Sequence, residues 1–224
     1  MTLCVYALTR GTSRVSATGI RGERMRVVRE GPLGAVVGAL PSVPRGSVGN
    51  LRRYDRTLGV LAATLPALLP ARFGTCFDEI DELRFVLRSR RPALQRALQH
   101  VRGRAQMTIR MVVAPAAAAV EPEDGRRQRP EDASRPGTAF LRSRAEAAAR
   151  ARHVEGFDPV RAAVRRWVRD ERVERRAGVT TVYHLVPRGS ADTYHRALEG
   201  AAARAGLRMR VTGPWPPYAF TEGW

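Results

Sequence analysis

Side chains that could do chemistry are few in this sequence and stand far apart. The four histidines, His100, His153, His184 and His195, include no pair at the i, i+4 spacing that places two ligands on one helix face. His184 lies in a run typical of a strand, and His195 lies in a run typical of a helix. We therefore expect a structural or surface role for each histidine, and no metal site.

The two cysteines, Cys4 and Cys76, are the other candidates. Cys76 could act as a nucleophile, but Asp78 and Glu79 follow it, and negative charge nearby raises rather than lowers the pKa of a thiol. Two cysteines are also too few for a disulfide framework or a zinc site. We expect packed, free thiols in a reducing compartment, with Cys76 as the best nucleophile if the protein is an enzyme.

Arginine supplies the whole basic complement. The 224 residues include 39 basic side chains against 21 acidic ones, a net charge of +18, and not one of the 39 is lysine. P-loop nucleotide hydrolases, protein kinases and Schiff-base enzymes all need a lysine. Arginine can hold an anion, but it stays protonated and cannot act as a general base. The absence of lysine therefore excludes these classes of enzyme, and nothing in the sequence calls for a cofactor.

The arginine excess raises nucleic-acid binding as an alternative function. The charge is spread, however: residues 1–103 carry 17 arginines and 7 acids, and residues 104–224 carry 22 and 14. No recognition helix, zinc finger or RNA-binding aromatic pair is evident. A helix predicted from residue 158 onward would present one charged face that could bind phosphates, consisting of Arg161, Arg165, Arg169, Arg172 and Arg176. Acidic neighbours dilute that face, and we do not expect nucleic acid to be the main partner.

The first half of the sequence predicts three strands followed by two helices. Apolar runs at 3–8, 25–29 and 33–40 are typical of buried strands. Ser47 is a candidate N-cap for a helix that reaches about residue 65, with an apolar stripe of Leu51, Tyr54, Leu58, Leu61 and Leu65. A second helix is expected after Asp78, with its apolar face continuing to residue 101.

The second half predicts strands at 107–113, 180–186 and 207–211, and helices at 140–154, from 158 to about 176, and at 192–205. Residues 114–137 have almost no large apolar side chain and are expected to form a disordered loop. The fold class is α+β with two domains, residues 1–103 and a ferredoxin-like domain of residues 104–212. Residues 213–224 are a proline- and aromatic-rich tail, which we expect to pack back on the N-terminal domain.

Two segments differ from ordinary loops. The first, residues 68–75, is apolar and contains Pro70, Arg72, Phe73 and Gly74. The second is stiffened by prolines near the polyproline II conformation, and consists of Gly213, Pro214, Trp215, Pro216, Pro217, Tyr218, Ala219 and Phe220. Most of this tail could pack on the chain itself, because so much apolar surface is rarely left in water. Alternatively, Trp215, Tyr218 and Phe220 could be presented to a partner.

These segments resemble the gas vesicle protein L/F family, and the resemblance covers nearly the whole chain. The opening residues 5–7, the strand at 107–111 and Phe140 with Arg144 stand in the order of that family; Gln106 stands where its members often carry an acidic residue. The resemblance implies an accessory protein without catalysis. It would bind the small hydrophobic shell protein, and other accessory proteins, during the nucleation and assembly of gas vesicles.

The sequence also indicates where the protein acts. Its N-terminus has neither a basic leader nor a long apolar run, so we expect no signal peptide. The longest nearly apolar stretch, residues 58–71, contains Pro66 and Pro70 and is shorter than the roughly 20 residues of a membrane span. We expect a cytoplasmic, gas vesicle-associated protein without a membrane anchor.

Overall fold

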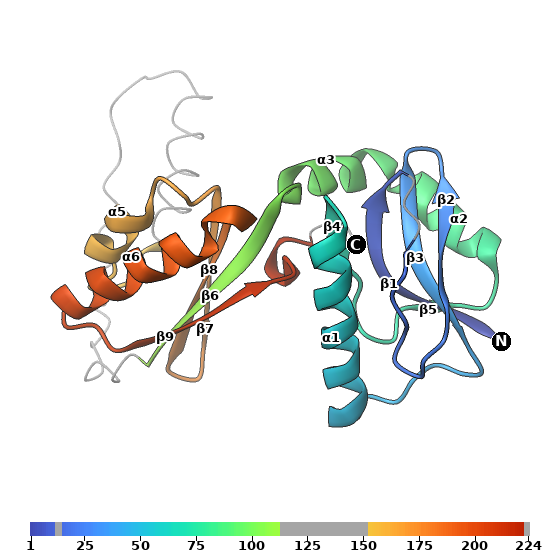
Figure 1. The fold of residues 1–224 in the computed structure, drawn as a ribbon, viewed down its shortest axis with the longest axis horizontal. Coiled ribbons are helices and arrows are strands. Elements are labelled where there is room, and N and C mark those ends of the chain that lie inside the picture. The colour runs from blue at the N-terminus through green and yellow to red at the C-terminus, as the bar shows by residue number, and fades with distance from the viewer. Residues whose placement is uncertain (12–14, 113–151, 222–224) are drawn as a thin grey trace, which may run out of the picture.

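A computed structural model describes residues 1–11, 15–112 and 152–221 (Figure 1). The predicted loop 114–137 and nearly all of the predicted helix 140–154 lie outside these residues. The described chain contains two antiparallel sheets with helices packed on them. The α+β class predicted from the sequence is therefore confirmed.

The first sheet has the order β2-β3-β1-β4, and β5 also pairs with β1. Its strands are β1 (Thr2–Arg10), β2 (Met25–Glu30), β3 (Leu33–Leu40), β4 (Leu68–Pro70) and β5 (Cys76–Phe77). In β1 every residue but the last is buried. A strand of this kind has no solvent-facing side, so both faces of the sheet must be covered by other elements.

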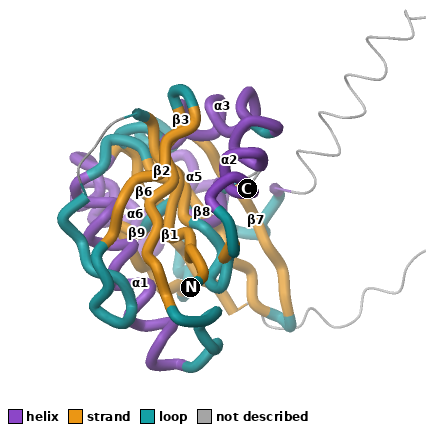
Figure 2. The backbone as a smooth tube through the Cα atoms, turned by 90° about the vertical axis from the view of Figure 1, so that its right-hand side faces the viewer, coloured by secondary structure: helices purple, strands orange, loops and turns teal. Residues whose placement is uncertain are grey.

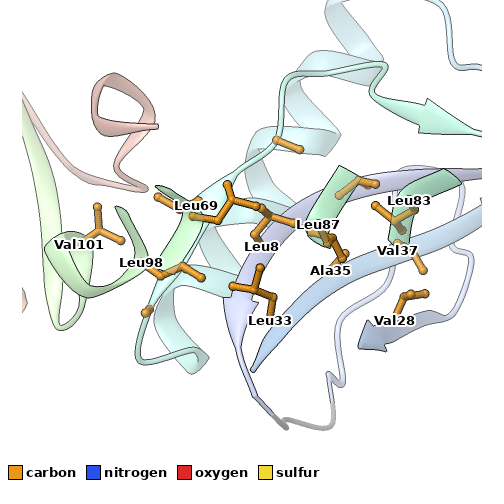
Figure 3. Packing of buried hydrophobic residues seen from close by; sticks show 14 of the residues in the cluster. Leu8, Val28, Leu33, Ala35, Val37, Leu69, Leu83, Leu87, Leu98 and Val101 are labelled. Atoms are coloured by element: carbon orange, nitrogen blue, oxygen red, sulfur yellow. The ribbon is translucent and has the colours of Figure 1, made fainter. Parts of the chain in front are cut away.

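Three helices provide that cover: α1 (Val48–Thr64), α2 (Ile80–Ser89) and α3 (Arg91–Val101). Figure 2 shows α1 on one side of the strands and α2 and α3 on the other. Tyr54 and Leu58 of α1 pack with Tyr6 and Val36. In Figure 3, Leu83 and Leu87 of α2 face the strands, and Leu98 and Val101 of α3 lie on the side of Leu69. The first half thus has two cores, one on each face of the sheet.

The start of α1 is as predicted, but its buried face is shifted. The Ser47 hydroxyl accepts a hydrogen bond from the Asn50 N–H at 3.2 Å, which is the geometry of an N-cap. Leu51, expected in the apolar stripe, is 45% exposed, and Thr57 takes a buried position instead. Leu51 is therefore an apolar side chain left on the outer surface of α1.

The second sheet has the order β7-β8-β6-β9 and is formed by β6 (Arg104–Val112), β7 (Asp170–Arg176), β8 (Val179–Pro187) and β9 (Met209–Trp215). Helices α5 (Asp158–Val164) and α6 (Ala191–Arg204) pack on one face through Val160, Val164, Tyr194 and Leu198. The sequence of elements β6-α5-β7-β8-α6-β9, in this strand order, is a ferredoxin-like arrangement, which is the class that the sequence predicts. Three of its four strands were predicted, and β7 was not.

The predicted helix from residue 158 to 176 is wrong. Helix α5 ends at Val164, and residues 170–176 form the edge strand β7, which pairs with β8. Arginine and glutamate have high helix propensity, so the sequence alone favours a helix there. A tight hairpin through Ala177 and Gly178, both at positive φ, overrides that preference by tertiary pairing. The arginine face expected along one helix consequently does not exist.

The conformation predicted for the start of the tail is also wrong. Residues 213–215 continue β9, and Trp215 lies opposite Gln106 of β6 after a register shift. Gly213 has φ +127°, and a Cβ on it would come within 2.8 Å of the Gln106 carbonyl oxygen. Only glycine fits this close approach of two backbones. The division of the chain into domains at residues 103 and 213 stays a prediction.

The expectation of free thiols is wrong as well. Cys4 and Cys76 form a disulfide, with Cα atoms 4.0 Å apart, and the residues described include no free cysteine. The two residues are 72 positions apart in sequence, and they meet only because β5 adds to the edge of β1 with Cys4 opposite Cys76. Inspection of the neighbouring sequence could not reveal this pairing, and Cys76 is not available as a nucleophile while the bond is formed.

The disulfide predicts a measurable dependence on reductant. Closing a loop of 72 residues removes entropy from the unfolded chain and stabilises the fold by up to about 4 kcal/mol in the chain-entropy model. We expect reduction to lower the free energy of unfolding, measured in urea with and without a phosphine reductant. A Cys4→Ala, Cys76→Ala variant should not respond to reductant. Two alkylatable thiols in the denatured, unreduced protein would contradict the pairing.

Candidate functional site

Helix α1 lies between the two segments singled out from the sequence, and each segment contacts it. Residues 68–75 begin as β4, where the buried Pro70 lies opposite Ala7 of β1. The Phe73 ring packs edge-on against Tyr54 of α1, with ring centroids 5.3 Å apart. The Tyr54 hydroxyl donates to the Ala71 carbonyl at 2.8 Å. These contacts fix the segment to the buried side of α1.

A tight turn follows at residues 72–75. The Arg72 carbonyl accepts hydrogen bonds from both the backbone N–H and the hydroxyl of Thr75, at 3.0 and 2.8 Å. Gly74 adopts φ +84°, a conformation that favours glycine. The Arg72 side chain is exposed. Within this segment Pro70, Phe73 and Gly74 therefore shape the chain, and Arg72 alone is placed to meet a partner.

The tail closes over the seam between the two sheets through Gln106 and Phe220. Gln106 of β6 is buried, and its Oε1 accepts a hydrogen bond from the Ala219 N–H at 2.7 Å. Phe220 is 2% exposed and belongs to the same hydrophobic cluster as Leu69 of β4 and Leu98 of α3. Arg172 of β7 lies over the Phe220 ring at 5.1 Å from its centroid. One tail residue thus joins α3, β4 and β7.

Tyr218 joins the tail to α1 directly. Its hydroxyl donates to the Asp55 carboxylate, although the two residues are 163 positions apart. Burial of the hydroxyl, together with this hydrogen bond, raises the pKa of Tyr218 above its ordinary range. The side chain as a whole is still 37% exposed, and that of Trp215 is 39% exposed. Pro216 and Pro217, between them, are buried.

A groove of about 170 Å³ runs between α1 and the tail. It is bordered by the small residues Gly59, Ala62 and Ala63 of α1, by residues 214–217, and by Arg104, Ala105 and Arg188 of the second half. Further along α1, Val48 and Leu51 are exposed at 66% and 45%. Helical spacing places Val48, Leu51, Asp55, Gly59 and Ala62 on one side of α1, which is the side that Tyr218 touches. We call Val48, Leu51, Gly59, Ala62, Trp215 and Tyr218 together the α1–tail surface.

The structure separates the predicted site residues into two groups. Trp215, Tyr218 and Arg72 are accessible, and Pro214 is exposed beside them. Pro216, Pro217 and Phe220 are buried, as expected for a tail that packs on the chain itself. Sequence reasoning missed Asp55 and Gln106, which position the tail. The helical spacing of Asp55 in line with Leu51 and Gly59 was a weak signal, and nothing in the sequence singled out Gln106 as a bridge.

His184 lies in a buried hydrogen-bond network rather than in an accessible site. Its Nε2 is 2.8 Å from Glu171 Oε2, and its Nδ1 is 2.6 Å from the Tyr194 hydroxyl. A neutral ring satisfies both contacts, because Nε2–H can donate to Glu171 while Nδ1 accepts from Tyr194. His184 and Tyr194 are both 0% exposed, so no substrate reaches them. The network fixes the position of α6 against β8.

Glu171 is the charged end of this network. Burial by itself raises the pKa of Glu171, but hydrogen bonds from His184 and Arg161 outweigh burial, and the pKa falls below its ordinary value of 4.5. The Arg161 Nε lies 3.1 Å from the carboxylate. The ionised carboxylate is therefore the form that the folded protein favours.

Within residues 1–11, 15–112 and 152–221, no three His, Cys, Asp or Glu side chains gather closely enough to hold a metal ion. No helix in that part of the chain has the length and apolar character needed to cross a membrane.

Comparison with known proteins places the chain in a family. Residues 2–222 match the model of the family described as gas vesicle synthesis protein GvpL/GvpF, and the chain belongs to that family. Gas vesicle protein L from Streptomyces sp. strain CB03234 is 29% identical, over 96% of this chain and 91% of its own. Gas vesicle protein L2 from Halobacterium salinarum is 30% identical, over 96% and 90%.

Two crystal structures share the fold. Gas vesicle protein GvpF from Anabaena sp. PCC7120 superposes with a TM-score of 0.74 at 14% identity, over 99% of this chain and 96% of that one. The protein of the same name from Microcystis aeruginosa gives a TM-score of 0.74 at 15% identity, over 99% of both chains. The resemblance noted from the proline-aromatic tail is therefore confirmed.

We expect Phe220→Ala to destabilise the protein by about 3–5 kcal/mol, because it removes a fully buried aromatic ring shared by three elements. Urea denaturation measures the change. Tyr218→Phe, which removes one hydroxyl at a partly exposed position, should cost only about 0.5–1.5 kcal/mol. Equal effects of the two substitutions would show that Phe220 does not anchor the tail.

The Glu171 network predicts a specific pH dependence. Because the pKa of Glu171 is lower in the folded than in the unfolded protein, its contribution to stability is present above about pH 4.5 and is lost as the pH falls through the folded value. Glu171→Gln should lower the free energy of unfolding by about 1–3 kcal/mol at pH 7. The difference from the unmutated protein should shrink toward pH 3. Glu199→Gln, which alters the exposed pair with His195, should leave the pH profile unchanged.

Proposed function

We propose that this protein is a non-catalytic accessory protein of gas vesicle formation, acting in the cytoplasm at forming vesicles. It binds the hydrophobic shell protein, and other accessory proteins, during nucleation and assembly. Membership of the GvpL/GvpF family supports this general role. The α1–tail surface is the observation that supports binding of an apolar partner.

The composition of the α1–tail surface suits an apolar helix or strand. Four large apolar or aromatic side chains on it are more than a third exposed: Val48, Leu51, Trp215 and Tyr218. Gly59, Ala62 and Ala63 have little side chain, so a partner's backbone can approach α1 closely beside Trp215. Tryptophan and tyrosine are the residues most often dominant in binding energy at protein interfaces.

The surface is also held rigid before any partner binds. Tyr218 is fixed to Asp55, Pro216 and Pro217 are buried, and Trp215 is the last residue of a paired strand. A preformed surface loses less conformational entropy on binding than a flexible segment does. The packing of the tail on the chain therefore holds Trp215 and Tyr218 in place for a partner.

The test is co-purification with the shell protein. Leu51→Ala combined with Trp215→Ala should reduce recovery of the shell protein at least about tenfold, because both side chains would lie at the centre of the contact. Both residues are substantially exposed, so the melting temperature should change little. The matched control is Phe85→Ala, which removes a 68% exposed aromatic ring from α2, on the opposite face of the first sheet.

Two results would contradict the proposal. One is undiminished co-purification by the Leu51, Trp215 variant. The other is an equal loss in the Phe85 variant, which would indicate nonspecific adhesion to exposed apolar groups. Deletion of the gene, followed by measurement of buoyancy and light scattering, tests the general role, and normal vesicles in a strain without a second family member would overturn it.

A further inference from the structure

A basic cleft lies between α3 and the second sheet. Two adjoining cavities of about 490 and 450 Å³ share Arg96 and His100 in their walls. One wall comes from α3, and the other from the start of β6 and from residues around the start of β7. Each cavity falls within the range of about 300–1,000 Å³ typical of small-molecule sites. Side chains from both halves of the chain therefore line the same cleft.

Positive charge dominates the cleft. Four arginines line it: Arg96, Arg104, Arg169 and Arg172. The one acidic side chain in the walls is Asp170, which is already engaged by His100 Nε2 at 2.9 Å and by the Glu171 N–H at 2.8 Å. A fifth arginine, Arg10, donates to Gln99 Oε1 at 2.8 Å, which leaves the Gln99 amide as a further donor at the rim.

Some of these arginines are held in place and others are open. Arg104 Nη1 donates to the His100 carbonyl, and Arg172 lies over the Phe220 ring. Arg96 and Arg169 are exposed, and their side chains make no hydrogen bond or ion pair with any described residue. The cleft thus combines a fixed basic floor with two guanidinium groups that can close on an anion from opposite walls.

We propose that this cleft binds a chain of two or three linked phosphates, either free or as the phosphate tail of a nucleotide. A guanidinium group matches the oxygens of a phosphate with two parallel hydrogen bonds. Four arginines distributed over two joined cavities suit several linked phosphates better than a single one. Because Arg96 belongs to α3 and Arg169 to the second half, the ligand also cross-links the two halves.

The test measures binding of tripolyphosphate, ATP and orthophosphate by calorimetry at about 150 mM salt, where long-range attraction is screened. We expect tripolyphosphate to bind and to raise the melting temperature, and orthophosphate to bind at least about tenfold more weakly. Arg96→Ala combined with Arg169→Ala should weaken tripolyphosphate binding at least about tenfold. Neither side chain has a hydrogen-bond or ion-pair partner among the described residues, so the melting temperature without ligand should stay the same.

The matched control is Arg52→Ala combined with Arg56→Ala, which removes two exposed arginines from α1 and the same total charge. It should change the affinity less than about twofold.

Equal loss in both double variants would mean diffuse attraction to a highly basic protein and would overturn the proposal. So would binding of a single-stranded oligonucleotide without binding of tripolyphosphate. Equal affinity for ATP and tripolyphosphate would identify the free phosphate chain as sufficient, and tighter binding of ATP would identify a nucleotide. The cleft does not overlap the α1–tail surface, so failure here leaves the proposed role in vesicle formation untouched.

Discussion

The placement of Phe220 is the contact on which the arrangement of the two sheets depends. The ring enters the cluster formed by α3 and the first sheet, while the residue before it is bound by the Gln106 side chain of the second sheet. Around this contact, Arg188 Nη1 donates to the Leu65 carbonyl and the Gly103 N–H donates to the Pro66 carbonyl. Apolar burial supplies the larger share of the stabilisation, and the hydrogen bonds fix the orientation.

The α1–tail surface and the basic cleft both depend on the Phe220 contact. On one side, the chain leading to Phe220 carries Trp215 and Tyr218 along α1. On the other side, the ring itself forms part of the wall of the basic cleft. The α1–tail surface carries exposed apolar and aromatic side chains, with Arg104 and Arg188 at the border of its groove, whereas the cleft is strongly basic.

The sequence predicted much of the fold, because its strongest signals were long apolar runs. The buried strands and the Ser47 cap follow from local pattern. The errors arose where pairing between distant segments decided the outcome. An arginine- and glutamate-rich stretch became the edge strand β7 through the hairpin at Ala177 and Gly178, and β5 brought Cys76 to Cys4.

In the candidate site, too, local pattern revealed the segments but not the distant residues that they contact. The proline-aromatic tail and the segment around Phe73 were evident from composition, and the tail led to the correct family. Their partners were not evident, since Asp55, Gln106 and Arg172 are ordinary polar residues until the chain is folded. The predicted arginine helix was wrong as a structure, although Arg169 and Arg172 do lie together with Arg96 of α3 in the basic cleft.

The distance in sequence between Asp55 and Tyr218 delays their contact during synthesis of the nascent chain. The two residues are 163 positions apart, and at ordinary rates of translation, about 5–20 residues per second, the ribosome needs roughly ten to thirty seconds to pass from one to the other. Early in that interval the rest of α1 and the strands β4 and β5 are made, which completes the first sheet, while the residues that cover the seam are made last. The nascent first half therefore displays apolar surface that only its own later segment will cover.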